Sequence, residues 1–337
     1  MIKTLIVDDS PLVRTIIRDF LEGDGSFEIA GEAENGLDGV NMAQNLAPDL
    51  ITMDIEMPVM NGLDAIVEIK KFINTTIVVI STHDTAKTAY DATVRGAMEF
   101  FTKDIFASKM SAEKRKEILD TLKHITGIKK RVPVPHNILK QPVITQRQVK
   151  CVVIAASTGG PKALCQLCEG LPKEFPVPIL LVQHNSSGFD RGFVQWLDGY
   201  TPLHVSLAAE GTIPAKGNIY VAPTDKHLIV GDTGIAFDNG KPVNNQKPAA
   251  DLLFKSAAAF YGKALVSVVL TGMGCDGAEG TRYVKQAGGI TIAQDEASSM
   301  IYGMPQAAAE TGCVDIVLPL GDIAQRLVYL TKGSGKA

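Results

Sequence analysis

The sequence lacks a long hydrophobic run and has few cysteines. None of its apolar stretches approaches the roughly 20 residues that a membrane-spanning helix needs. Met1 leads directly into a predicted strand, without the basic and apolar regions of a signal peptide. Its five cysteines are odd in number and show no disulfide-framework spacing. These absences predict a cytoplasmic protein with reduced thiols and no membrane insertion.

The chain also has little excess of either charge. It contains 33 Lys and Arg residues against 37 Asp and Glu residues, a net charge of −4, which disfavours nucleic acid as a partner. Hydrophobic residues make up 45% and charged residues 21%, as in globular proteins. At 337 residues we expect two domains, each with its own core.

Residues 1–124 alternate strand and helix patterns five times, which predicts an α/β domain with a parallel sheet and helices on both faces. The predicted strands are 3–7, 27–33, 49–53, 76–81 and 98–101, and the predicted helices are 11–22, 36–46, 62–71, 85–95 and 111–125.

Polar side chains follow the predicted strands of this half. Asp8, Asp9 and Asp54 come directly after the first and third strands, and Ser81 and Lys103 lie at the ends of the fourth and fifth. The carboxyl ends of parallel strands share one edge, where ligands bind. Clustered carboxylates suit Mg²⁺, and one of them could be a nucleophile toward phosphorus. Any one of these acids alone could simply be solvated, but five matching positions favour a site.

This half resembles a two-component receiver domain over its whole length, including the segment Met57–Gly62. The resemblance implies a flavodoxin-like (βα)5 fold. It also implies functional residues, namely Asp8 and Asp9 as the metal-binding pair, Asp54 as phosphoacceptor and third Mg²⁺ ligand, and Ser81, Lys103 and Phe100 as the switch residues. One departure is Asp104, where receivers usually have proline. A cis bond before a non-proline residue costs about 3 kcal/mol, so the usual cis Lys–Pro bond is not expected here.

Residues 125–149 differ in composition from both halves. They contain five basic residues, no acidic ones and three prolines, which is typical of an extended linker. A basic run can bind nucleic acid or an acidic partner, but it is more often a solvated hinge.

The segment Cys151–Ala156 is predicted to be a buried strand that ends at Ser157. Gly159, Gly160 and Pro161 cannot continue it, and Pro161 suits the start of a helix. Backbone N–H groups at such a turn can stabilise an oxyanion beside a nucleophilic serine. They can equally cradle a phosphate, with Ser157 only capping the helix. This stretch alone does not distinguish the two.

Two further polar residues follow predicted core strands, His184 after 178–183 and Asp276 after 263–270. Ser157, His184 and Asp276 can therefore meet at one sheet edge as a nucleophile, its base and an orienting carboxylate. Other elements are an antiparallel hairpin set at 218–222, 227–231 and 235–237, strands at 289–293 and 313–318, a helix at 302–309 and a last helix ending at Leu330.

Two motifs suggest other functions. Gly272-x-Gly274-x-x-Gly277 follows a strand, and Asp295 comes 18 residues later, as in a dinucleotide-binding fingerprint. The charge of Asp276 within that loop opposes pyrophosphate binding. The pair Cys165-x-x-Cys168 lies inside a predicted helix instead of at its start, so we expect no redox or metal role.

Residues 150–333 resemble the catalytic domain of the CheB family of chemotaxis methylesterases. The matching motifs are Ala156–Pro161, Gln183-His184, Ile219–Pro223 with Asp225 and His227, Pro242–Asn244, Thr271–Gly274 with Asp276–Ala278, Gln294–Ser299 and Tyr302–Pro305. The resemblance implies a doubly wound α/β domain with Ser157 as nucleophile, His184 as base and Asp276 as its partner. It places oxyanion donors near Met273 and beside Ser157, at Thr158. The segment Asn185–Gly188 departs from the usual Met-Pro after the histidine.

Together the resemblances imply a phosphorylation-activated serine hydrolase that demethylates glutamate esters on methyl-accepting chemoreceptors, releases methanol and also deamidates glutamines. They imply phosphorylation by the histidine kinase CheA with Mg²⁺, and no cofactor for the ester chemistry. A phosphorylation-controlled adaptor without catalysis is the alternative. A DNA-binding response regulator is not favoured, because no helix-turn-helix pattern follows the linker.

Overall fold

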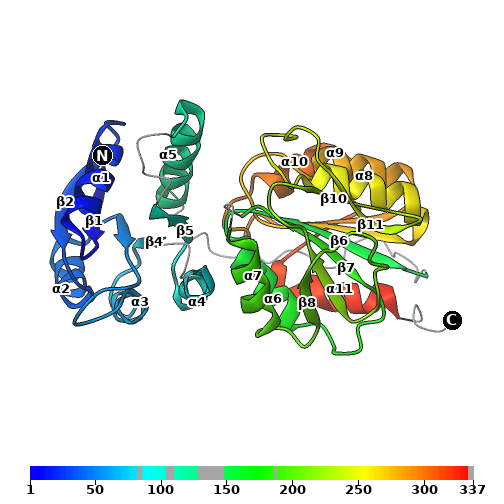
Figure 1. Cartoon of the computed structure of the whole chain (residues 1–337), viewed down its shortest axis with the longest axis horizontal. Coiled ribbons are helices and arrows are strands. Elements are labelled where there is room, and N and C mark those ends of the chain that lie inside the picture. The colour runs from blue at the N-terminus through cyan, green and yellow to red at the C-terminus, as the bar shows by residue number, and fades with distance from the viewer. Residues whose placement is uncertain (82–85, 104–109, 128–147, 186–187, 333–337) are drawn as a thin grey trace. The chain divides into compact units, whose positions relative to one another are not determined.

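The computed structural model describes residues 1–81, 86–103, 110–127, 148–185 and 188–332. The chain divides into two compact units, Met1–Lys130 and Arg131–Ala337, drawn in Figure 1. Most of the predicted linker, residues 128–147, lies outside the described part. Within the described ranges, no helix is both long and apolar enough to cross a membrane.

The first unit contains the five-stranded parallel sheet that the sequence predicted, and its strand order is β2-β1-β3-β4-β5. Its strands are β1 (Ile2–Val7), β2 (Phe27–Ala33), β3 (Leu50–Met53), β4 (Thr76–Ser81) and β5 (Glu99–Thr102). Its helices are α1 (Pro11–Glu22), α2 (Gly36–Leu46), α3 (Gly62–Lys70), α4 (Ala86–Arg95) and α5 (Ala112–Gly127).

Local sequence signals set where these helices begin. The side chains of Ser10, Asn35 and Asn61 accept hydrogen bonds from the first turns of α1, α2 and α3. All four residues of β3 are buried, as expected for a central strand with helices on both faces. The carboxyl ends of β1, β3, β4 and β5 therefore point toward one edge, which carries the predicted acidic residues.

The second unit is built on a seven-stranded sheet in the order β14-β13-β12-β6-β7-β9-β8, in which every pairing is parallel. Its strands are β6 (Cys151–Ala156), β7 (Ile179–Gln183), β8 (His204–Leu207), β9 (Asn218–Val221), β12 (Leu265–Val269), β13 (Ile290–Gln294) and β14 (Ile316–Leu318). The chain proceeds from β6 to one side of the sheet and later returns beside it as β12. This change of direction creates a crevice at the carboxyl ends of β6 and β12.

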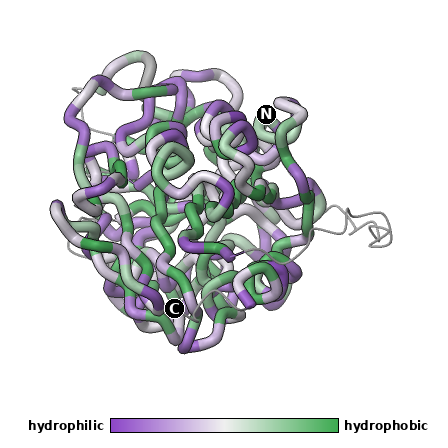
Figure 2. Tube along the Cα trace, turned by 90° about the vertical axis from the view of Figure 1, so that its right-hand side faces the viewer, coloured by the Kyte–Doolittle hydropathy of each residue, from purple (hydrophilic) through white to green (hydrophobic). Residues whose placement is uncertain are grey.

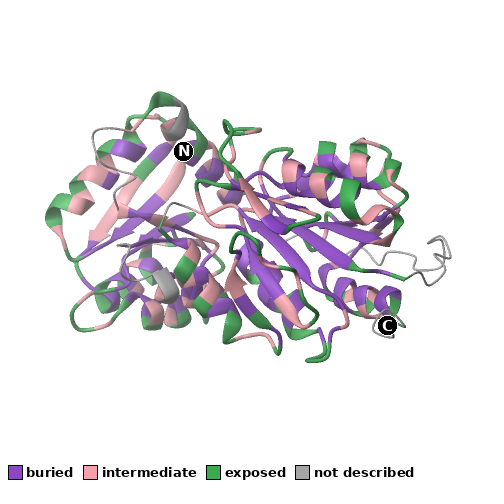
Figure 3. Cartoon of the chain, turned by 45° about the vertical axis from the view of Figure 1, so that its right-hand side comes forward, coloured by how far each residue is buried: buried purple, intermediate pink, exposed green. Residues whose placement is uncertain are grey.

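Helices cover both faces of this sheet (Figure 1). One face carries α6 (Gly160–Glu169), α7 (Asp190–Asp198) and α11 (Leu320–Thr331), and the other carries α8 (Ala250–Tyr261), α9 (Ala278–Gln286) and α10 (Met304–Glu310). Figure 3 shows the strands of this sheet largely buried and the outer faces of its helices exposed. Figure 2 shows hydrophobic and hydrophilic residues alternating along the trace.

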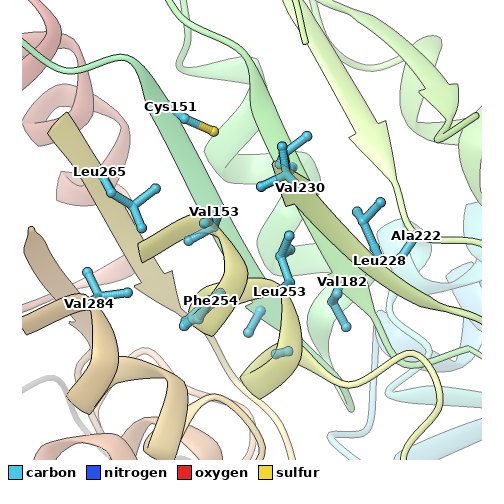
Figure 4. Close-up of a cluster of buried hydrophobic side chains, with 14 of the residues drawn as sticks. Cys151, Val153, Val182, Ala222, Leu228, Val230, Leu253, Phe254, Leu265 and Val284 are labelled. Carbon is cyan, nitrogen blue, oxygen red and sulfur yellow. The ribbon is translucent and has the colours of Figure 1, made fainter. Parts of the chain in front are cut away.

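A hydrophobic core fills the space between α8 and the sheet and supports the central strands. Leu253 and Phe254 of α8 lie in one buried cluster with Val153 of β6 and Leu265 of β12 (Figure 4). All six residues of β6 are buried, because a central parallel strand has helices on each face. The strand that leads to Ser157 is thus packed on both of its faces.

The predicted hairpin set is wrong in one member. Only β10 (His227–Gly231) and β11 (Gly234–Asp238) form an antiparallel pair, whereas β9 joins the main sheet between β7 and β8. Short apolar runs divided by Pro and Gly look alike in sequence, and pairing partners decide between them. Strand β8 and helices α7 and α8 were not predicted, and the strand predicted at 313–318 begins only at Ile316.

Candidate active site

Ser157 occupies the turn between β6 and α6. Its backbone N–H donates to the carbonyl oxygen of Thr271, at a donor–acceptor distance of 3.0 Å, which ties the turn to the end of β12. The N-cap of α6 is Gly159, with a φ of 76° and no side-chain cap. Glycine adopts this left-handed conformation without strain. Ser157 therefore does not cap the helix, and its hydroxyl is left for other chemistry.

His184 lies beside Ser157 because of the strand register. Ala156 pairs with Gln183 across β6 and β7, so residues 157 and 184 follow matched positions on strands about 4.8 Å apart. The N–H of His184 also donates to the carbonyl oxygen of Ala156, at 3.0 Å. The register alone brings the predicted nucleophile and base to the same place at the sheet edge.

Asp276 completes the predicted group from the loop after β12. Its Oδ2 lies 2.8 Å from Nε2 of His184, and the side chains are 2% and 7% exposed. Asp276 also accepts N–H donors from Ala250 (2.7 Å), Asp251 (3.0 Å) and Gly277 (3.1 Å). Burial acts to raise the pKa of Asp276, but the hydrogen bond and charge of His184 and the N–H groups of Ala250 and Asp251 outweigh it and lower the pKa. The carboxylate is therefore ionised at neutral pH.

The imidazole presents Nδ1, the ring nitrogen that Asp276 does not contact. Nδ1 is buried and has no hydrogen-bond partner among the described residues. When Nε2–H donates to Asp276, neutral His184 carries its lone pair on Nδ1. This orientation is the reverse of the chymotrypsin triad, in which Nδ1 faces the aspartate and Nε2 faces the serine. A neutral imidazole with its lone pair on Nδ1 can accept a proton from a neighbouring hydroxyl.

The loop Thr271–Gly274 forms the other wall beside Ser157. A Cβ atom placed on Gly272 would lie only 2.7 Å from Cβ of Ser157, so the serine side chain packs directly against this loop. The Thr271 hydroxyl lies 3.0 Å from the carbonyl oxygen of Thr158 and accepts the N–H of Ile301 at 2.9 Å. Thr158 and Met273, the predicted oxyanion neighbours, thus lie on segments that are tied together next to Ser157.

The dinucleotide alternative does not fit this geometry. A pyrophosphate would need free N–H groups at the start of α9. The N–H groups of Gly277 and Gly280 instead donate to Oδ1 of Asp251, at 2.9 and 2.6 Å. A buried carboxylate of the protein already fills the anion position. Cys165 and Cys168 are free thiols inside α6, and burial raises the pKa of each to about 12, which disfavours the reactive thiolate.

Three residues that support the site were given no role by sequence analysis: Gln183 and Thr271 appeared only within matching motifs, and Asp251 did not appear at all. Gln183 donates from its side chain to the carbonyl oxygens of Ser157 and His184, Thr271 links both sides of the crevice, and Asp251 binds the turn after Asp276. Asp251 follows Pro248 and precedes an apolar run, which signals only a helix start. Nothing local in the sequence indicates which distant backbone groups these side chains bind.

The first unit brings the predicted acidic residues together at the edge of its own sheet. Carboxylate oxygens of Asp8, Asp9 and Asp54 lie within 4.8 Å of one another. Nζ of Lys103 lies 2.9 Å from Oδ2 of Asp8 and 2.8 Å from Oδ2 of Asp54. Burial, together with the charge of Asp8, raises the pKa of Asp54 to about 6 although Lys103 opposes this. Hard oxygen donors and this like-charge crowding fit a divalent cation such as Mg²⁺.

The remaining predicted switch residues also lie near this edge. Ser81 is the last residue of β4 and is 2% exposed. Phe100 on β5 is buried and packs edge-on against Tyr90 of α4, with ring centroids 4.7 Å apart. Asp104, the departure from the receiver pattern, lies outside the described residues.

Comparisons with known proteins agree with this architecture. The family model for CheB methylesterase matches residues 152–327, and that for the response regulator receiver domain matches residues 4–114. A relative from Pyrococcus horikoshii, named protein-glutamate methylesterase/protein-glutamine glutaminase, is 39% identical over 99% of this chain and 95% of its own. A relative of the same name from Thermotoga maritima is 35% identical, with 98% of each chain covered.

A solved structure leads to the same family. The crystal structure of the Thermotoga maritima CheB methylesterase catalytic domain is 39% identical to this chain and superposes with a TM-score of 0.52. The alignment covers 54% of this chain and 98% of the Thermotoga maritima domain. The matched part of this chain corresponds to the second unit. With its seven-stranded sheet, its serine turn and the preceding receiver domain, this chain belongs to the CheB methylesterase family of response regulators.

Proposed function

We propose that the protein hydrolyses methyl esters of glutamate side chains on methyl-accepting chemoreceptors, in the cytoplasm, and releases methanol. The observation that carries this proposal is the 2.8 Å contact between His184 and Asp276, beside Ser157 at the matched end of the next strand. The names of the relatives supply the substrate class, protein glutamate esters and glutamines.

In this mechanism Ser157 is the nucleophile and His184 is the base. The Ser157 hydroxyl oxygen attacks the ester carbonyl carbon while Nδ1 of His184 takes its proton. Asp276 stabilises the imidazolium that forms through its contact with Nε2. Backbone N–H groups near Thr158 and Met273 would stabilise the oxyanion of the tetrahedral intermediate.

Collapse of the intermediate breaks the bond to the methoxy group, which leaves as methanol with the proton from Nδ1. A water molecule, deprotonated by the same nitrogen, then attacks the acyl-enzyme and frees the glutamate carboxylate and Ser157. With a glutamine substrate, the same steps release ammonia. Every proton that leaves Ser157 or water passes through His184, so no cofactor is required for this chemistry.

Phosphorylation of Asp54 by the histidine kinase CheA would control this activity. Mg²⁺ held by Asp8, Asp9 and Asp54 would neutralise charge on the transferred phosphoryl group. Lys103 already contacts two of these carboxylates, and with Ser81 it would bind the phosphoryl oxygens. A phosphoryl group that binds one receiver conformation better than another shifts the population of states, with Phe100 as the switch aromatic.

The test is methanol release from methylated receptor membranes. We expect release by the wild-type protein to rise with a small phosphodonor plus Mg²⁺ and to vanish in Ser157→Ala. Release that survives in Ser157→Ala would exclude this serine as the nucleophile. Wild-type and Ser157→Ala proteins that both release no methanol, yet bind receptors in a phosphodonor-dependent way, would support the adaptor function instead.

A further inference from the structure

Two buried carboxylates, Asp251 and Asp276, lie close together where helices α8 and α9 begin. Asp251 lies in the first turn of α8, and Asp276 lies two residues before Ala278, where α9 begins. The helices pack side by side (Figure 1). Asp251 is 7% exposed and Asp276 is 2% exposed, so both charges depend on partners within the protein.

Each aspartate accepts hydrogen bonds from the start of the helix next to the other aspartate. Asp276 accepts the N–H groups of Ala250 and Asp251 at the start of α8, at 2.7 and 3.0 Å. Asp251 in turn accepts the N–H groups of Gly277 and Gly280 at the start of α9, at 2.9 and 2.6 Å. Asp276 therefore binds the positive N-terminal end of α8, where Asp251 lies, and Asp251 binds the positive N-terminal end of α9, which follows Asp276. The N–H of Gly277 lies between them and donates to both.

These hydrogen bonds depend on a close approach of the two helices. A Cβ atom on Gly280 would lie 2.6 Å from Cβ of Phe254 and 3.1 Å from Cα of Asp251. Glycine at position 280 is therefore what lets its N–H reach the Asp251 carboxylate. The second oxygen of Asp251 accepts the side-chain amide of Asn244 at 2.8 Å, so both oxygens of Asp251 are bound.

The charges around the pair are few. Among the described residues, His184 is the only basic side chain within ion-pair distance of either carboxylate. Burial raises the pKa of Asp251, as does the charge of Asp276, against the hydrogen bonds from Gly280, Asn244 and Gly277. Cys275 is the other ionisable neighbour, and burial and both aspartates raise the pKa of its thiol. Hydrogen bonds, more than opposite charge, hold the carboxylates in place.

We infer that Asp251 is a positioning residue of the ester hydrolysis, which fixes the turn 276–280 and thereby the Asp276 oxygen that orients His184. Asp251 does not touch the reacting atoms. It acts through Gly277 and Gly280 on Asp276, and through Asp276 on the imidazole. Without it, the buried N–H groups of the turn lose their acceptor and the turn moves to regain one. The inference rests on the proposed function for its kinetic part only.

The experiment compares full-length wild type, Asp251→Ala and Asp251→Asn, with Asp322→Asn as matched control in the first turn of the remote helix α11. The measurements are kcat and KM for methanol release from methylated receptor membranes, and the NMR signal of the His184 Nε2 proton. In Asp251→Ala we expect kcat to fall roughly tenfold to a hundredfold, the scale of a small misplacement, with KM within about twofold. The Nε2 proton signal should shift or broaden.

Asp251→Asn keeps an oxygen acceptor for Gly277 and Gly280, so it should recover most of the lost kcat, and Asp322→Asn should match wild type. If Asp251→Ala does not fold, Asn244→Gly removes only the amide donor while glycine keeps the φ of 52°, and its kcat should fall with KM unchanged. Wild-type kcat and an unchanged Nε2 signal in the folded variants would overturn the inference. A shifted Nε2 signal without methanol release by any protein would support the positioning role and refute the proposed substrate.

Discussion

Gln183 links its side-chain amide to the backbone of Ser157, with Nε2 3.1 Å from the serine carbonyl oxygen. The same Nε2 lies 2.9 Å from the carbonyl oxygen of His184. One buried side chain, 2% exposed, therefore fixes the main chain of the nucleophile relative to that of the base. The side-chain amide carries two N–H donors, which suit two carbonyl acceptors.

The first prediction concerns this link. Gln183→Glu keeps the shape but replaces two donors with acceptors that face two buried carbonyl oxygens. We expect the free energy of unfolding to fall by about 1–3 kcal/mol, and kcat to fall with it. Urea denaturation and methanol release measure the two effects. Gln195→Glu, on the exposed side of α7, is the control and should change neither. Wild-type stability and activity in Gln183→Glu would show that the link is dispensable.

Asp276→Asn tests the orientation of the imidazole. The amide of asparagine can donate to Nε2 of His184, which favours the tautomer with its proton on Nδ1 and removes the base. We expect kcat to fall by about 10⁴, as for the equivalent change in the chymotrypsin triad, with KM little changed. Steady-state methanol release measures both constants. The exposed Asp238→Asn is the control. A loss of less than about tenfold would mean that Asp276 does not set the tautomer.

Asp54→Asn should stabilise the metal-free receiver domain in a pH-dependent way. The pKa of Asp54 is raised from 3.8 to about 6, so its charged form is disfavoured in the folded state. Aspartate therefore lowers the free energy of unfolding above pH 6, and this cost disappears below about pH 4, where both states are protonated. We expect Asp54→Asn to gain about 1–3 kcal/mol at neutral pH, partly offset by the lost contact with Lys103.

Denaturation with a chelator present, at several pH values, measures this gain. The exposed Asp19→Asn on α1 is the control and should show no such pH dependence. Added Mg²⁺ should reverse the order of stability, since the wild-type carboxylate is a metal ligand and the amide is a weaker one. A gain that persists unchanged at pH 4 would rule out the ionisation of Asp54 as its cause.

Removal of residues 1–149 tests receiver control. If the unphosphorylated receiver inhibits the catalytic domain, the fragment 150–337 should release methanol faster than the full-length protein without phosphodonor. The same fragment with Ser157→Ala should be inactive, which excludes a contaminating esterase. Circular dichroism establishes that the fragment is folded. Unchanged or lower activity in a folded fragment would count against inhibition by the receiver.

Much of the fold and of the site was determined by the sequence alone. Buried parallel strands appear as apolar runs ended by Gly, Pro or polar residues, so the five receiver strands and the core strands β6, β7 and β12 were predicted correctly. Residues at the carboxyl ends of such strands share one edge. For that reason Ser157, His184 and Asp276, like Asp8, Asp9 and Asp54, could be grouped from their positions at the ends of apolar runs.

Only the tertiary structure decided how these groups bind one another. His184 turns Nε2 toward Asp276, whose Oδ2 also accepts the backbone N–H of Ala250, and its Nδ1 has no hydrogen-bond partner among the described residues. Membership of β9 in the main sheet, and the hydrogen bonds of Asp251 and Asp276 to the starts of α9 and α8, likewise join segments far apart in sequence. Periodicity and turn residues report on local conformation, whereas such contacts depend on packing between distant elements, which leaves no local pattern to read.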